Sequence, residues 1–144
     1  MLIGKMAKEV SKPELKESGQ EYEIDELYTY IGRKSTPCYI IYAINRSTRQ
    51  VIDFVMGART KENIGKVLRS IMQLYPKRIY TDSLPTFKFL IPADVHRSLR
   101  YRTNRIERKN LTLRTHLKRL GRKTICYSKS KAMLEACFRL YVWQ

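Results

Sequence analysis

Long hydrophobic runs are missing from this sequence. The longest unbroken apolar run is Cys38 to Ile44, seven residues, whereas a membrane-spanning helix needs about 20. The first residues, MLIGKMAKEVSKPELKES, contain no apolar stretch of the kind that a secretory signal carries. We therefore expect a protein that neither crosses a membrane nor is exported.

Cysteine is also scarce. The chain has three, Cys38, Cys126 and Cys137, which are widely spaced and form no Cys-x-x-Cys pair. An odd number at such spacing argues against a disulfide framework, and against a zinc site built from these residues alone. We expect buried, reduced thiols, as in a cytosolic protein.

Acidic residues are few. Asp and Glu number 13 against 29 Lys and Arg, which gives a formal net charge of +16. Most of the excess lies in residues 97–131, where thirteen basic residues stand against the single acid Glu107. This density of positive charge predicts a nucleic acid as partner. A membrane surface is a weaker match, because the stretch has no Trp or Phe to anchor it.

The length of 144 residues and the 43% hydrophobic content fit one domain with a real core. We expect residues 1–20 to be a linker or loose N-terminal segment and residues 21–144 to form the domain. Alternation and β-formers predict strands over 21–31, 38–44, 50–56, 78–81 and 95–99. Apolar spacing and caps predict helices after Thr60 and over 83–91, 104–120 and 131–143.

The order of these elements predicts the topology. Three strands joined by short turns make an antiparallel meander. The helix that follows them makes the fourth strand parallel to the first. We therefore expect an α/β protein with a mixed sheet, in which three antiparallel strands are followed by helix-linked parallel strands. This is the ribonuclease-H-like fold.

Three carboxylates stand out in this arrangement. Asp25 lies within the first strand, where acids are depleted, and Asp82 ends the fourth, where open α/β sheets bind ligands. Neighbouring strands would bring these two together, and the helix that carries Glu107 could reach them. Three close carboxylates repel one another unless cations lie between them. Oxygen ligands favour Mg²⁺ or Mn²⁺, and two such ions suit phosphodiester chemistry.

Each carboxylate also has a simpler interpretation. Asp25 would face solvent if the first strand were an edge strand. Asp82 could cap the helix that follows it. Glu107 could pair with a basic residue one helical turn away.

Four segments carry a resemblance to a known family: Ile24–Leu27, Tyr80–Ser83, Asn104–Thr115 and Lys118–Ser128. Through them the chain resembles the catalytic part of an Asp-Asp-Glu transposase of the insertion-sequence-one type. The spacers between the three carboxylates are 56 and 24 residues, and the short second spacer is the one that this family uses. The twelve-residue Asn104–Thr115 match is the most specific of the four.

The resemblance implies a DNA transposase that cleaves the ends of an insertion sequence and transfers the freed strand to target DNA. It implies that Asp25, Asp82 and Glu107 are catalytic and bind two Mg²⁺ (or Mn²⁺) ions. Arg114 lies two helical turns after Glu107 and would match the family's basic residue near the triad. We expect DNA contacts from Arg105, Arg108, Lys109, Arg114, Lys118, Arg119, Arg122 and Lys123.

The expected partner is double-stranded DNA, both element ends and target, and synapsis of two ends implies a homodimer. The resemblance also implies an upstream zinc-binding and helix-turn-helix segment in the full transposase. The expected location is the cytoplasm, in association with the nucleoid. Two alternatives stay open: a non-catalytic DNA-binding regulator and an inactive transposase remnant. The roles of His96 and His116 are also open.

Overall fold

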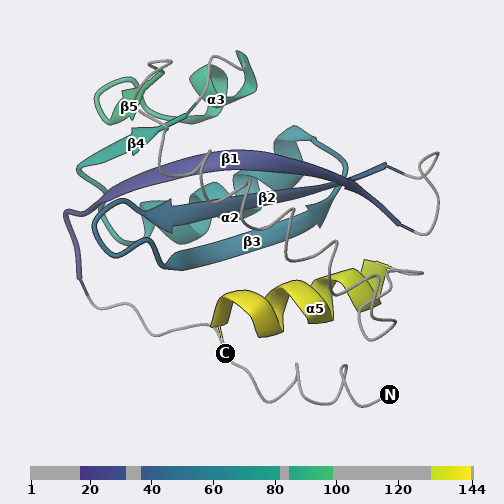
Figure 1. Cartoon of the computed structure of the whole chain (residues 1–144). Coiled ribbons are helices and arrows are strands. Elements are labelled where there is room, and N and C mark those ends of the chain that lie inside the picture. The colour runs from purple at the N-terminus through teal and green to yellow at the C-terminus, as the bar shows by residue number, and fades with distance from the viewer. Residues whose placement is uncertain (1–16, 32–36, 82–84, 99–130, 144) are drawn as a thin grey trace.

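The computed structural model describes residues 17–31, 37–81, 85–98 and 131–143. Its strands are β1 (Glu21–Tyr30), β2 (Pro37–Asn45), β3 (Val51–Gly57), β4 (Arg78–Tyr80) and β5 (His96–Arg97). They form one sheet in the order β3-β2-β1-β4-β5 (Figure 1). The first three strands are antiparallel, and β4 runs parallel to both β1 and β5. The predicted mixed sheet, with its parallel fourth strand, is confirmed.

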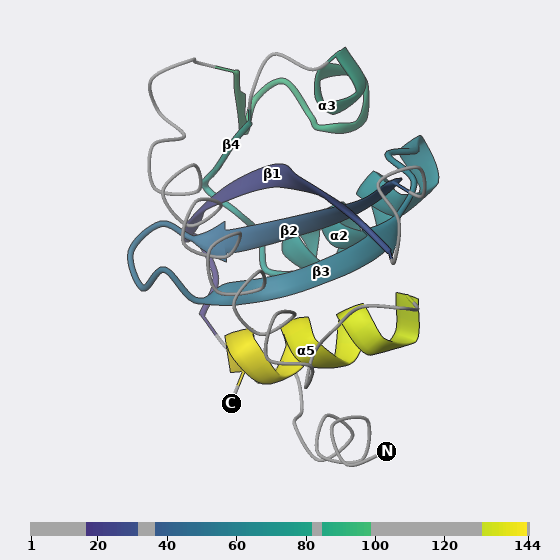
Figure 2. The ribbon, with the colours of Figure 1, turned by 45° about the vertical axis from the view of Figure 1, so that its right-hand side comes forward.

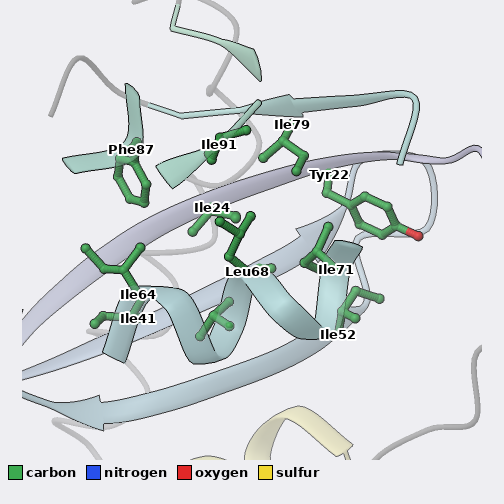
Figure 3. Close-up of a cluster of buried hydrophobic side chains, with 12 residues drawn as sticks. Tyr22, Ile24, Ile41, Ile52, Ile64, Leu68, Ile71, Ile79, Phe87 and Ile91 are labelled. Atoms are coloured by element: carbon green, nitrogen blue, oxygen red, sulfur yellow. The ribbon is translucent and has the colours of Figure 1, made fainter. Parts of the chain in front are cut away.

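Helix α2 (Lys61–Met72) covers one face of the sheet. It begins at Thr60, whose side-chain oxygen accepts a hydrogen bond from the Asn63 amide at 3.2 Å. Such a bond satisfies one of the open N–H groups of a first helical turn. The buried face of α2 carries Ile64, Val67, Leu68 and Ile71, at the spacing that was predicted. Figure 3 shows three of them packed with isoleucines of the strands and with Phe87 and Ile91.

Helix α5 (Lys131–Trp143) covers the opposite face, so the sheet lies between the two helices (Figure 2). Leu134 and Phe138 belong to a second core with Leu27, Tyr42 and Phe54 of the strands. The rings of Phe54 and Phe138 meet edge to face, with their centroids 4.7 Å apart. At the end of α5 the Trp143 Nε1–H donates to the Val51 carbonyl at 2.9 Å. The helix is thereby fixed to the sheet by packing and by a hydrogen bond.

The third described helix, α3 (Pro85–Leu90), connects β4 to β5. Its Phe87 is fully buried in the first core. Strand β5 is only two residues long and pairs with Ile79 and Tyr80 alone. The predicted strand over 95–99 is therefore present, and its described part is shorter than expected. The predicted helix over 104–120 lies outside the described residues, as does most of the 1–20 segment.

The cysteine prediction was partly wrong. Cys38 is buried and free, as expected. Cys137 is buried but disulfide-bonded, because spacing along the chain does not tell which sulfurs the fold brings together. Within the described helices, no segment combines the length and the apolar character that a transmembrane span requires.

Candidate active site

Asp25 is the one member of the predicted triad within the described part of the chain. It lies in the middle of β1, directly opposite Tyr42 of β2, and is half-buried. Side chains alternate along a strand, so Asp25 shares its face with Leu27, which packs in the core under α5. Asp25 thus lies on the α5 face of the sheet, in an inner strand. The interpretation as a residue of an exposed edge strand is wrong.

Strands β1 and β4 pair in parallel just before Asp25. Their three described pairs are Glu21 with Arg78, Tyr22 with Ile79, and Glu23 with Tyr80. Two residues beyond the last pair, the sequence has Asp25 in one strand and Asp82 after the other. Asp82 itself lies outside the described residues.

Glu107 and the predicted DNA contacts also lie outside the described residues. Among the residues that the structure describes, no group of three or more His, Cys, Asp or Glu side chains could hold a metal. The predicted site is therefore represented by Asp25 and by its surroundings on β1 and β4. The predicted contacts concerned are Arg105, Arg108, Lys109, Arg114, Lys118, Arg119, Arg122 and Lys123.

A buried ion pair adjoins Asp25 on the same face. Glu23 is fully buried, and its Oε1 lies 2.9 Å from Nε of Arg46. The Arg46 guanidinium lies over the Tyr80 ring, 4.0 Å from its centroid, and its Nη1 is 3.6 Å from Oε2 of Glu21. The guanidinium of Arg46, in the β2–β3 turn, thus contacts both β1 and β4. Its contacts with Glu23 and Tyr80 lie two residues before Asp25 and Asp82 in the sequence.

The end of β4 is held from its other side as well. Thr81 is fully buried, and its hydroxyl lies 2.6 Å from Nε2 of His96 in β5. The Thr81 amide also donates to the Arg97 carbonyl at 3.2 Å. Burial, and then the positive charge of Arg97, lower the pKa of His96. The neutral ring that this favours can accept a hydrogen bond from the Thr81 hydroxyl, so His96 fixes the residue that precedes Asp82.

The third acid of β1, Glu26, faces the α2 side. Its carboxylate is 6% exposed and pairs with Arg59 Nη1 at 3.1 Å. Sequence reasoning noted that acids are depleted within strands, but it missed the arginine partners of both Glu23 and Glu26. Strand alternation could have indicated that Glu26 faces away from Asp25. The partners could not be found in this way, because Arg46 and Arg59 approach β1 only through the register of β2 and β3.

Two solved structures show the same fold at low sequence identity. The HTLV-2 integrase catalytic core domain, in complex with magnesium, matches with a TM-score of 0.54 and 16% identity over 89% of this chain and 98% of that one. The simian T-cell lymphotropic virus intasome with PP2A regulatory subunit B56 gamma matches at 0.59 and 18%, over 88% and 51%. The predicted ribonuclease-H-like fold is confirmed.

Sequence relatives are closer. The insertion element iso-IS1n protein InsB of Shigella dysenteriae is 34% identical over 120 residues, which are 83% of this chain and 92% of the relative. The IS1 2 protein InsB of Escherichia coli (strain K12) is 38% identical over 75% of this chain and 65% of its own length. The InsB protein of Shigella flexneri is 38% identical over 75% and 82%. The sequence profile of the IS1 transposase family matches residues 21–143. The chain therefore belongs to the IS1 transposase family.

Proposed function

We propose that this insertion-sequence transposase cleaves and joins DNA with Asp25, Asp82 and Glu107 as its catalytic carboxylates. The observation that carries the proposal is the parallel pairing of Glu23 with Tyr80. If the same register continued for two residues, Asp25 and Asp82 would be neighbours on adjacent strands, with their backbones roughly 4.8 Å apart across the sheet. Each carboxylate would then leave the same face of the sheet, since each lies two residues beyond a paired residue.

We propose that the three carboxylates hold two divalent cations, Mg²⁺ or Mn²⁺. The donor chemistry fits, because carboxylate oxygens are the ligands that these ions prefer. Asp25 fits as well, because its carboxylate is half-buried on an inner strand, and a carboxylate in such a place gains from a neighbouring cation. When bound, such ions would activate the attacking water or 3′ hydroxyl and stabilise the charge on the leaving oxygen.

The described residues around Asp25 would position this chemistry. Arg46 holds β1 and β4 together through Glu23 and Tyr80, and His96 holds Thr81 at the end of β4. Neither of these residues needs to contact DNA for this role. Rigid strands would keep the carboxylates at the spacing that two bridged ions require.

DNA is the proposed partner, as element ends and as target. The net charge of +16 supports this, since basic side chains that neutralise phosphates supply most of the affinity for DNA. We propose that the eight basic residues from Arg105 to Lys123 named above make these contacts. A homodimer would bring two element ends together.

The test is a cleavage assay on a labelled duplex that spans the junction between the encoding element and its flanking DNA. With Mg²⁺ or Mn²⁺ present, Asp25→Asn, Asp82→Asn and Glu107→Gln should each slow cleavage on the order of 100-fold or more. Binding of the duplex should persist, because each change removes a negative charge. Glu135→Gln is the matched control: it removes the same charge from α5, where Glu135 makes only a 4.0 Å pair with Arg139.

Two results would contradict the proposal. One is near-normal cleavage by any of the three triad variants. The other is salt-sensitive DNA binding by the unmodified chain, without cleavage at any metal concentration. The second result would favour the non-catalytic regulator or the inactive remnant.

A further inference from the structure

Strand β3 is an end strand of the sheet. In the order β3-β2-β1-β4-β5 it has β2 on one side, and no strand in the described part of the chain pairs with its outer side (Figure 1). Its seven residues, VIDFVMG, include one charged residue, Asp53. An apolar edge of this kind is a template on which a strand of another chain can pair. It therefore needs protection from such pairing.

The pairing of β3 with β2 determines which backbone groups of β3 point outward. The Asn45 amide donates to the Gln50 carbonyl at 3.0 Å, and bonded and non-bonded pairs alternate along antiparallel strands. The next residue of β3, Val51, lies opposite Ile44. It therefore points its N–H and C=O groups away from β2, toward the outer edge.

A β-bulge interrupts this alternation one residue later. Ala43 pairs with Asp53 while its neighbour pairs with Val51, so Ile52 is an extra residue in β3. Ile52 packs in the core under α2, and Asp53 accepts a hydrogen bond from the hydroxyl of Ser70 in α2. Two consecutive side chains thus lie on the α2 face. Beyond the bulge, Phe54 is the next residue whose backbone groups point outward.

Side chains bond to the outward groups of both Val51 and Phe54. Asp53 Oδ1 accepts from the Phe54 amide at 2.9 Å, while Ser70 holds the same carboxylate through Oδ2. Trp143 Nε1 donates to the Val51 carbonyl at 2.9 Å, and its ring packs on Phe54 with the centroids 5.3 Å apart. One donor and one acceptor that an added strand would need are therefore already bonded within the domain.

We propose that Asp53 and Trp143 keep the outer edge of β3 from pairing with the same edge of a second copy of the chain. A second copy is the matching occupant because every copy carries this edge, and two such edges can meet antiparallel about a two-fold axis. The inference does not depend on the proposed catalysis, since Asp53 lies on the α2 face and Asp25 on the opposite one. It implies that a homodimer that joins two element ends would use another surface.

The test is sedimentation of the full chain, without DNA or metal, over a range of protein concentrations. Asp53→Ala combined with Trp143→Phe should raise the average mass about two-fold over that of the unmodified chain as concentration rises. Trp143→Phe keeps a ring against Phe54 and removes only the Nε1–H donor. Asp94→Ala is the matched control, because it removes the same charge from an exposed position between α3 and β5. Its mass should stay that of the unmodified chain.

Amide hydrogen exchange locates the contact. In Asp53→Ala alone, at a concentration where the chain does not associate, the Phe54 amide should exchange roughly 2- to 10-fold faster because its hydrogen bond is lost. Asp53→Asn keeps a carbonyl oxygen that can accept from this amide, so it should retain the original rate. In the associated double variant, exchange at Phe54 should become slower as concentration rises, since the edge of the second copy would bind that amide.

Three results would overturn the inference. In the first, the folded double variant keeps the mass of the unmodified chain at every concentration. In the second, it associates without slower exchange at Phe54, which places the contact elsewhere. In the third, Asp94→Ala associates to the same extent, which makes the lost charge the cause. If the double variant does not fold, the single variants decide: equal exchange at Phe54 in Asp53→Ala and Asp53→Asn would exclude the proposed role of Asp53.

Discussion

Replacing Arg46 by Met should destabilise the protein strongly, because it removes the Arg46 cation from the fully buried Glu23 carboxylate. The Arg46 side chain is 17% exposed and lies 2.9 Å from Glu23. Removing one partner of such a pair costs about 3–5 kcal/mol, and loss of the guanidinium from the Tyr80 ring adds about 0.5–2 kcal/mol. Since domains are stable by only about 5–15 kcal/mol, the change removes a large fraction of the total.

A double-variant comparison tests the cause of this loss. In Arg46→Met combined with Glu23→Met, both charges are replaced by apolar side chains of similar volume, a change that is often neutral or stabilising. The double variant should therefore be more stable than Arg46→Met alone. Arg139→Met is the control, because it removes a partly exposed pair at 4.0 Å, worth about 1 kcal/mol or less. It also removes a cation 5.2 Å from the Trp143 ring centre, worth about 0.5–1 kcal/mol.

Urea unfolding measures these differences, provided that the slopes of the transitions agree. The reasoning would be refuted if Arg46→Met lost less than about 1 kcal/mol, well below the expected range for a buried pair. It would also be refuted if the double variant were no more stable than Arg46→Met, since the buried charge would then not be the cause.

Three further predictions concern the helices and β5. Thr60→Ala should cost about 1 kcal/mol in urea unfolding because the bond to the Asn63 amide is lost, whereas Thr60→Ser should cost much less; equal losses would contradict a capping role. Phe138→Ala should cost about 3–5 kcal/mol by opening a cavity between α5 and the sheet, and Phe138→Leu should cost clearly less in the same assay. The lowered pKa of His96 means that the unfolded chain binds its proton more readily, so stability should fall as pH drops below about 6.5. Stability measured between pH 7 and 5 should decline less in His96→Gln, and an unchanged decline would argue against this assignment.

Most of the fold could be predicted because local and long-range signals agree along this chain. Alternation identified β1, the continuous apolar run Cys38–Ile44 identified β2, and a short turn before Gln50 set off β3. Thr60 with the apolar spacing after it identified α2. A helix between β3 and β4 then made a parallel pair the natural arrangement. The short β5 was harder to delimit, since only two of its residues pair with β4 and so short a strand leaves little pattern in the sequence.

The candidate site could be predicted only in part. The sequence indicated that Asp25 matters because an acid within a strand is unusual. The same argument applies equally to Glu23 and Glu26, so it could not single out Asp25. The structure separates them: Glu23 and Glu26 bind arginines from later segments. These contacts depend on strand register, which local patterns leave undetermined. The structural role of His96 also depends on a neighbour, Thr81, fifteen residues earlier.

The position of α5 in the chain has a consequence for biosynthesis. In the core that α5 covers, the last strand residue along the chain is Met56. Leu134 of α5 follows about 78 residues later, and Phe138 follows after it. At roughly 5–20 residues per second, a ribosome needs about 4 to 16 s to make the intervening chain. During that interval α5 cannot shield the nascent sheet face of Leu27, Tyr42 and Phe54. This apolar face is one that a chaperone could bind before the transposase domain is complete.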